Sequence, residues 1–113
     1  MKPRSAKNKG KRLQNKVRDL ILEKFNTLEP DDVRSTVMGD SGEDVLLSPA
    51  ARRKFPFSIE CKNQEAVNVW KAYEQASENC KGYEPLVVIK RNRHKPLVVM
   101  DAEKFVQLIK HEE

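Results

Sequence analysis

Glu60 and Lys62 are charged residues within an otherwise apolar segment of the chain. Over residues 55–62 apolar and polar residues alternate, which predicts a β-strand whose successive side chains point to opposite faces. One face carries Phe55, Phe57, Ile59 and Cys61, and the other carries Ser58, Glu60 and Lys62. Charged groups beside a core are costly unless they are paired or bind a ligand, so these two residues are candidates for a chemical role.

Asp44 supplies a second carboxylate, at the start of a short predicted strand over residues 44–47. If the Asp44 and Glu60 carboxylates meet across adjacent strands, they form a hard oxygen site suited to Mg²⁺, for which Mn²⁺ can substitute. The backbone carbonyl of Cys61 would add a metal ligand, and Lys62 would orient an attacking water. This chemistry supports hydrolysis of phosphodiester bonds. The alternative is an ordinary surface ion pair between Glu60 and Lys62, which the Glu-x-Lys spacing alone favours.

Positive charge is concentrated at the N-terminus of the 113-residue chain. The 22 Lys and Arg residues exceed the 17 Asp and Glu residues by five. Residues 1–12 contain six basic residues and no acidic residue, so this segment carries +6 and the remaining chain carries −1. A polycationic segment is attracted to nucleic acid because each neutralised phosphate releases counterions. We therefore expect a basic flexible arm over residues 1–12 that binds DNA, with a solubilising tail as the alternative.

Two further basic clusters lie in predicted loops. The first is Arg52 to Lys54, and the second is residues 90–95, between two apolar runs that predict a β-hairpin. Each cluster alone is typical of a solvated loop, but three clusters that converge in space would form one phosphate-binding surface. The predicted DNA contacts in the three clusters are Lys7, Lys9, Lys11, Arg12, Arg52, Arg53, Arg91 and Arg93.

The hydrophobic pattern predicts a single α/β domain over residues 13–113. Apolar residues recur at helical spacing over residues 11–27 and again from residue 66 to about 79, with Asn63 as the expected N-cap of the second helix. Strands are expected over residues 33–38, 44–47, 55–62, 86–89 and 97–100. Asp101 is expected to cap a last helix. The order is α-β-β-β-α-β-β-α, and the strand-helix-strand crossover over residues 55–89 predicts a mixed sheet with helices on both sides.

The same pattern assigns several side chains to the core. Trp70 is expected to pack inside the domain, and the last helix is expected to carry Phe105, Leu108 and Ile109 inward. No apolar run exceeds four residues, so we expect a soluble protein without a membrane span. The basic N-terminus lacks the apolar stretch of a secretory signal, so we expect the chain to stay inside the cell. The two cysteines, Cys61 and Cys80, are too few for a disulfide framework or a zinc cluster.

The N-terminal helix, a hairpin carrying Gly42-Glu43-Asp44-Val45, and Ile59-Glu60-Cys61-Lys62-Asn63 before a helix form a recognisable combination. Over about residues 8–110 the chain resembles the PD-(D/E)xK nuclease superfamily, and more closely the small phage-encoded endonucleases related to archaeal Holliday junction resolvases. The resemblance implies a restriction-endonuclease-like fold. It matches Asp44 to the motif aspartate, Glu60 to the second acidic residue and Lys62 to the motif lysine, which in that family bind divalent metal and position water.

The sequence departs from the family pattern at two places. Glu43 precedes Asp44 where a proline is usual, so Glu43 competes with Asp44 as a ligand, and we favour Asp44. Many archaeal resolvases carry a metal-linked glutamate on the first helix, where this chain has Gln14. Gln14 can hydrogen-bond a phosphate or a water, or Glu23 can substitute from farther along the helix, so the number of metal ions stays open.

Two more residues are assigned to the DNA interface. The resemblance suggests that Gln75 lies near the site or near DNA, although an exposed helical glutamine is an equal alternative. Ser41 lies in the turn before Asp44, where it would contact a phosphate or only form the turn.

The resemblance implies a Mg²⁺-dependent endodeoxyribonuclease that acts on branched DNA, in the manner of a Holliday junction resolvase. Resolving a junction requires two matched cuts, which a two-fold homodimer supplies. A nicking or flap endonuclease of the same fold is one alternative, and a non-catalytic basic DNA-binding or accessory module is another. A phage-encoded enzyme of this kind would act in the cytoplasm of the bacterial host.

Overall fold

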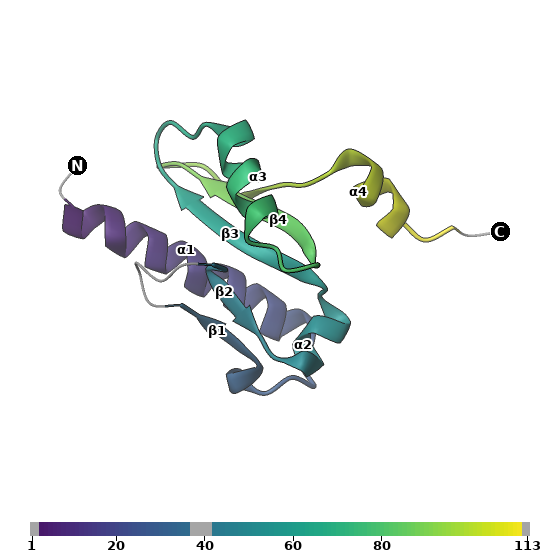
Figure 1. The fold of residues 1–113 in the computed structure, drawn as a ribbon. Coiled ribbons are helices and arrows are strands. Elements are labelled where there is room, and N and C mark those ends of the chain that lie inside the picture. Colours follow the sequence, from purple (N-terminus) through teal and green to yellow (C-terminus); the bar gives the residue numbers. More distant parts are fainter. Residues whose placement is uncertain (1–2, 37–41, 112–113) are drawn as a thin grey trace.

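The chain folds into a five-stranded sheet flanked by helices, as a computed structural model that describes residues 3–36 and 42–111 shows (Figure 1). The strands are β1 (Val33–Ser35), β2 (Val45–Leu47), β3 (Phe57–Asn63), β4 (Glu84–Lys90) and β5 (Leu97–Val99). The helices are α1 (Pro3–Lys24), the 3-10 helix η1 (Pro30–Asp32), α2 (Pro49–Lys54), α3 (Val69–Glu78) and α4 (Ala102–Leu108). The expected α/β order is confirmed, with η1 and α2 as short additions.

The sheet is mixed, with spatial order β1-β2-β3-β4-β5. β3 and β4 run parallel, in a register that pairs Ile59 with Leu86, and α3 forms the crossover between them. The other three pairs are antiparallel. The expected mixed sheet is therefore confirmed, and so is the basic hairpin, because residues 91–96 join the antiparallel strands β4 and β5.

Each face of the sheet is covered by one long helix. Leu86 and Val88 of β4 pack in the cluster that contains Leu13 and Val17 of α1. The intervening Val87 packs with Ala72 and Ala76 of α3. Because alternate residues of a strand point to opposite faces, α1 and α3 lie on opposite sides of the sheet (Figure 1).

Helix α1 is longer at its N-terminus than the pattern predicts. It begins at Pro3 and ends at Lys24, whereas the hydrophobic period indicates only residues 11–27. Residues 3–12 of the basic segment are polar on every side, so no apolar stripe marks them, yet they are helical and continuous with the rest of α1. That this segment acts as a separate arm stays a prediction. In the described part of the chain, no helix has an apolar stretch long enough to cross a bilayer.

Helix α3 begins later than predicted and buries a different side. Its N-cap is Asn68, whose side-chain oxygen accepts a hydrogen bond from the backbone N–H of Lys71, whereas the predicted cap, Asn63, ends β3. The small residues Ala72 and Ala76 face the sheet, and a position two residues away lies about 200° around a helix. Trp70 is therefore 81% exposed, and its predicted core role is wrong.

The last helix forms where predicted but does not cover the core. Asp101 accepts a hydrogen bond from the backbone N–H of Lys104 at 2.9 Å, which confirms the predicted cap. The side chains predicted to point inward, Phe105, Leu108 and Ile109, are 53%, 45% and 62% exposed. This prediction is wrong because α4 extends away from the sheet instead of folding against it (Figure 1).

Candidate active site

Asp44, Glu60 and Lys62 line one cavity of about 460 Å³. Glu60 and Lys62 come from the middle and the end of β3, and Asp44 directly precedes the adjacent strand β2. Helix α1 closes the cavity from the basic end of the chain. The other side chains that face this space include Lys7, Gln14, Cys61, Asn63 and Asn79. The structure thus brings together the three residues that the sequence singles out.

The backbone and the side chain of Asp44 are both held in place. Its N–H donates to the carbonyl of Ile59 at 2.8 Å, and its carbonyl accepts from the N–H of Thr36 at 3.0 Å, which extends the sheet ladder beyond β2. Its Oδ2 accepts a hydrogen bond from the N–H of Cys61 at 2.7 Å. The chain enters through Gly42, whose φ of +98° is a conformation that other residues rarely adopt. These contacts direct Oδ2 of Asp44 toward β3, and the carboxylate of Asp44 lies beside Glu60.

Glu60 is a buried carboxylic acid, only 8% exposed. Its Oε1 accepts a weak hydrogen bond from Nδ2 of Asn79 at 3.4 Å. Burial, the charge of Asp44 and a hydrogen bond with Asp44 together raise the pKa of Glu60 from 4.5 to about 7, although Asn79 and Lys62 oppose the shift. The two carboxyl groups are therefore in direct contact, and one of them is readily protonated near neutral pH.

Cys61 contributes its backbone to the site, and its thiol stays neutral. Burial, together with the nearby charges of Asp44 and Glu60, raises the pKa of the Cys61 thiol far above its ordinary value. A thiolate is the form that attacks substrates or binds metals, so the raised pKa disfavours both roles for this side chain in the metal-free protein. The predicted metal-binding group of Cys61 is its carbonyl, which is consistent with this environment.

Glu43 does not line the cavity and is instead paired with Arg52. It is 6% exposed and forms a salt bridge with Arg52. Arg52 also donates to the carbonyl of Phe57 at 2.9 Å, and its guanidinium lies 4.2 Å from the ring centre of Tyr83. This arrangement favours Asp44 over Glu43 as the acidic residue of the site. Arg52 is thus engaged within the fold, and its predicted contact with DNA stays a prediction.

The donor set fits a hard divalent cation. Two carboxylates in contact, one with a raised pKa, repel each other when both are ionised, and a cation between them would relieve that repulsion. Among the described residues no three His, Cys, Asp or Glu side chains are grouped as a metal cage. Mg²⁺ does not need such a cage, since it is usually bound by one or two carboxylates with waters and substrate phosphates. The buried Oδ1 of Asn63 has no hydrogen-bond partner among the described residues and offers another oxygen in the cavity wall.

The structure separates the two candidates on the first helix. Gln14 is 3% exposed and lines the cavity beside Asp44 and Glu60. Glu23 is exposed and lies nine residues farther along α1, which is about 13 Å of helix. Of the two, only Gln14 is in a position to act on a ligand in the cavity.

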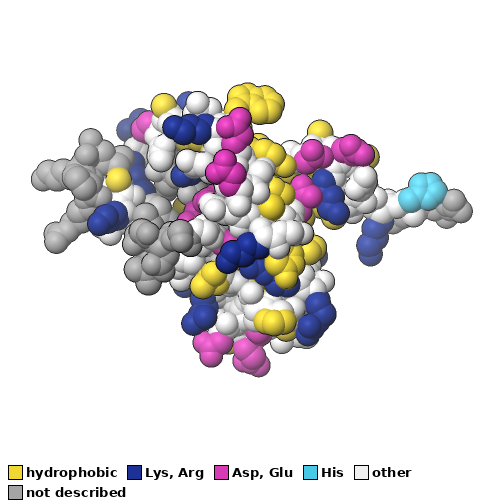
Figure 2. All heavy atoms as spheres, in the orientation of Figure 1, with side chains coloured by type: hydrophobic (Ala, Val, Ile, Leu, Met, Phe, Trp, Pro, Cys, Tyr) yellow, Lys and Arg dark blue, Asp and Glu magenta, His cyan; other side chains and the backbone are white. Residues whose placement is uncertain are grey.

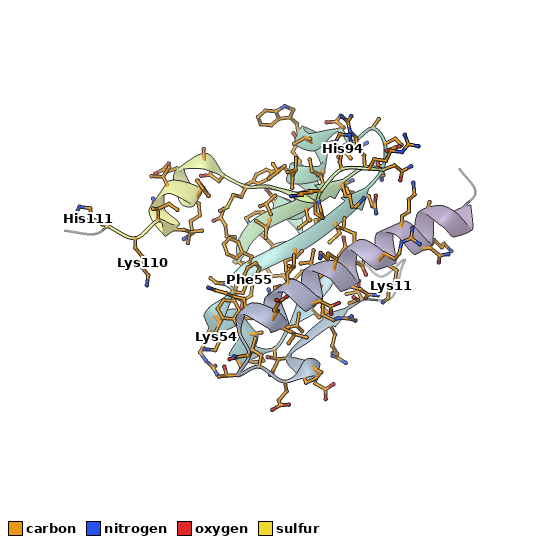
Figure 3. The ribbon with its side chains drawn as sticks, turned by 180° about the vertical axis from the view of Figure 1, so that it is seen from behind. Lys11, Lys54, Phe55, His94, Lys110 and His111 are labelled. Carbon is orange, nitrogen blue, oxygen red and sulfur yellow. The ribbon has the colours of Figure 1, made fainter. Side chains whose placement is uncertain are left out.

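The predicted DNA contacts divide by location. Lys7 lines the cavity, and Gln75 lines an adjoining pocket that also includes Lys62. Arg12 and the hairpin residues Arg91 and Arg93 are exposed. Figure 3 shows the hairpin, marked by His94, at the same end of the sheet as the N-terminal half of α1.

The remaining predicted contacts lie elsewhere or are engaged. The backbone carbonyl of Lys9 accepts a hydrogen bond from Asn63, and Lys11 donates to the carbonyl of Thr36 at 3.0 Å. Arg53 is exposed on α2, which precedes the opposite end of β3. The predicted contact of Ser41 lies outside the described residues.

Sequence reasoning missed Asn63 and Asn79 as members of the site. Asn63 donates to the carbonyl of Lys9 at 3.0 Å and so fastens the end of β3 to α1. Asn79 is the C-cap of α3. Because α3 forms the crossover between β3 and β4, its C-terminal end lies beside Glu60, to which Asn79 donates a hydrogen bond. The predicted crossover between two parallel strands is the sequence feature from which this position of the helix end, beside the middle of β3, could have been inferred.

The comparison with protein families agrees with this geometry. The family described as phage putative PDDEXK endonuclease matches residues 5–113, so the chain belongs to this family. The class of protein defined by the fold, the site and the match is a nuclease of the PD-(D/E)xK type. Neither the curated proteins nor the solved structures gave a match to the chain. The relation to archaeal resolvases stays a prediction.

Proposed function

We propose that this protein is a metal-dependent DNA endonuclease that hydrolyses phosphodiester bonds at the cavity formed by Asp44, Glu60 and Lys62. The observation that carries the proposal is the contact between two carboxyl groups beside a lysine, at the basic end of α1. The family match supports nuclease chemistry, and PD-(D/E)xK nucleases generally use divalent metals.

Asp44, Glu60 and the carbonyl of Cys61 would hold Mg²⁺, or Mn²⁺ in its place. The ion would stabilise negative charge as it develops on the phosphate. Asp44 is fixed by the N–H of Cys61, so its carboxylate needs no rearrangement to bind. Glu60 must release its proton to take part, which its raised pKa delays until near-neutral pH.

Lys62 would act on the water and the phosphate. Lys62 lines the same cavity as the two carboxylates, and its positive charge lowers the pKa of Glu60, which supports this role. A lysine in this place orients a water through hydrogen bonds and stabilises charge on the phosphate in the transition state. Gln14 would hydrogen-bond the phosphate or a water from the opposite wall.

Basic residues around the cavity would hold the DNA backbone. Lys7 faces the cavity, and Arg91 and Arg93 extend from the hairpin at the same end of the sheet. Contacts of this kind position DNA without reading its sequence. We propose branched DNA as the substrate, cut on two strands by a homodimer, in keeping with the resemblance to junction resolvases.

A cleavage panel tests the proposal. The purified protein is incubated with a four-way junction, a flap, a nicked duplex, a linear duplex and single-stranded DNA, each with Mg²⁺, with Mn²⁺ or with a chelator. We expect metal-dependent cleavage that is fastest on the four-way junction. Preference for the flap or the nicked duplex would change the substrate assignment. Binding without cleavage in every metal would support the non-catalytic DNA-binding module.

A further inference from the structure

Helix α4 carries an apolar face that its own chain leaves exposed. Phe105 and Leu108 are three residues apart and share one side of the helix, and Ile109, its C-cap, follows four residues after Phe105. The neighbouring Val106 is 66% exposed. Figure 2 shows α4 as a separate lobe beside the body of the molecule. Contiguous apolar side chains of this kind mark an interaction surface on a soluble protein.

A groove of complementary character lies on the α1 side of the body. It has a volume of about 380 Å³ and runs between α1, β4 and β5. Its walls include Leu20, Ile21, Phe25, Leu86, Val88 and Val98. Leu20 is 49% and Val98 is 57% exposed, so the groove leaves large apolar side chains in contact with solvent. Figure 3 views this side of the molecule, with the groove residue Phe55 labelled.

The two residues before α4, Met100 and Asp101, direct the helix away from this groove. Met100 packs against the core on the α1 side, with Leu86 and Val88. The next residue, Asp101, lies beside Tyr73 of α3, on the other side of the sheet, where its charge and its backbone both act on the pKa of the Tyr73 hydroxyl, which burial raises. Asp101, with φ of −59° and ψ of 129°, is not yet helical, and α4 begins at the next residue. With these two contacts in place, α4 projects past the end of the sheet and does not turn under it.

We propose that two copies of this chain exchange their α4 helices, so that Phe105, Leu108 and Ile109 of each copy pack into the groove between α1, β4 and β5 of the other. The helix and the groove are both present in every chain. The exchange is therefore reciprocal and closes as a two-fold dimer, with no groove left over.

The buried area is sufficient for a dimer. Six side chains contribute, each about half exposed: Leu20, Val98, Phe105, Val106, Leu108 and Ile109. Apolar side chains of this size expose roughly 100 Å² each at that fraction. Two copies then bury on the order of 1,200 Å², before the rest of the groove is counted, and specific interfaces bury about 1,200–2,000 Å² in total.

The mass of the full chain in solution is the first test. Sedimentation equilibrium should give twice the chain mass for the parent protein. Ile109→Asp at the C-cap of α4 and Leu20→Asp in the groove should each give the single-chain mass, because each places a charge in the apolar contact. Both side chains are exposed in the single chain, so the variants should keep the parent circular dichroism spectrum. Gln107→Asp, also on α4, is the matched control and should stay dimeric.

Cross-linking distinguishes exchange from a helix that folds back on its own chain. Leu20→Cys and Ile109→Cys are made separately, each with Cys80→Ser, and the two proteins are mixed and treated with a short bis-maleimide. Exchange gives a covalent species of twice the chain mass that contains one of each variant. The proposal would be overturned by a monomeric parent protein or by a dimer that neither aspartate variant disrupts. It would also be overturned if a chain carrying both Leu20→Cys and Ile109→Cys cross-linked only within itself.

This inference does not depend on the nuclease assignment. The helix and the groove contain none of the residues that line the candidate active site, and the measurements use no DNA. A monomer would therefore leave the proposed chemistry intact, while an inactive protein would leave the dimer intact. If both proposals hold, the exchange supplies the two active sites that paired cuts require.

Discussion

Oδ2 of Asp44 accepts a hydrogen bond from the backbone N–H of Cys61 at 2.7 Å, and this bond joins the two parts of the candidate active site. Cys61 lies between Glu60 and Lys62 on β3, so the position of Asp44 is fixed relative to both. The carboxylate of Asp44 also contacts Glu60, whose pKa rises to about 7 because of burial and this contact.

The stability of the metal-free protein should depend on pH through Glu60. Its pKa is 4.5 as the ordinary value and about 7 in the folded chain, so the folded state retains a proton that the unfolded state releases. The free energy of unfolding should therefore fall as pH rises from about 4.5 to about 7, by roughly 3 kcal/mol, and then level off. Urea denaturation in chelator at several pH values measures this change.

Glu60→Gln should remove this fall, and Glu78→Gln, an exposed position on α3, should retain it. A parent protein whose stability is flat between about pH 5 and about pH 7 would show that Glu60 titrates normally.

Lys62→Ala should abolish cleavage and preserve metal binding. The lysine acts on the water and the phosphate, while the carboxylates hold the ion, so the two functions separate. We expect the single-turnover cleavage rate to fall by about 10²- to 10⁴-fold. Lys54→Ala, at the end of α2 and so before the opposite end of β3, is the matched control and should cleave at close to the parent rate. Equal rates for Lys62→Ala and the parent would remove Lys62 from the mechanism.

Arg52→Ala should destabilise the fold, whereas Arg53→Ala should not. Removing the Arg52 guanidinium leaves the carboxylate of Glu43 buried without its cation, which costs about 3–5 kcal/mol in comparable cases. Arg53 is exposed, so its loss should change the free energy of unfolding by less than about 0.5 kcal/mol. Chemical denaturation measures both.

Adding Glu43→Gln to Arg52→Ala should restore part of the loss, because it removes the unpaired charge. If Arg52→Ala were as stable as the parent but bound DNA more weakly, the original assignment of Arg52 to the DNA surface would be correct.

Trp70→Ala should leave stability unchanged and weaken DNA binding. The indole is 81% exposed, so its removal uncovers no core. Its neighbours Val69 and Lys71 line the two pockets beside the hairpin and beside Lys62, and we predict that the exposed ring between them stacks on a base. Such stacking is worth about 1–3 kcal/mol. Fluorescence anisotropy with labelled junction DNA measures the affinity, and Trp70→Phe should retain most of it. A large loss of stability would instead return Trp70 to the core.

The fold was predictable from sequence because its periodic signals are strong. The alternation over residues 55–62 and the helical stripe of Leu13, Val17 and Ile21 both correspond to buried faces. The position of Asp44 beside β3 was predictable because Asp44 precedes β2, and β2 pairs with β3. These are patterns of local spacing, which a sequence carries directly.

The errors occur where the choice depends on tertiary contacts. Asn63 and Asn68 are both good helix caps, and only the length of β3 decides between them. The side of the helix that faces the sheet is set by the packing of Ala72 and Ala76 against Val87, which leaves Trp70 exposed. The apolar face of α4 is visible in the sequence, but the pattern does not say which groove covers it. A basic residue such as Arg52 likewise does not reveal that its partner is Glu43.

Calorimetric titration with Mn²⁺ tests the central claim most directly, because it needs no knowledge of the substrate. At about pH 8, where Glu60 is ionised, the parent protein should bind at least one Mn²⁺ per chain. Asp44→Asn and Glu60→Gln should each lose this binding, and Glu78→Gln should keep it. Absence of binding by the parent, or equal binding by Glu60→Gln, would contradict a metal site between Asp44 and Glu60.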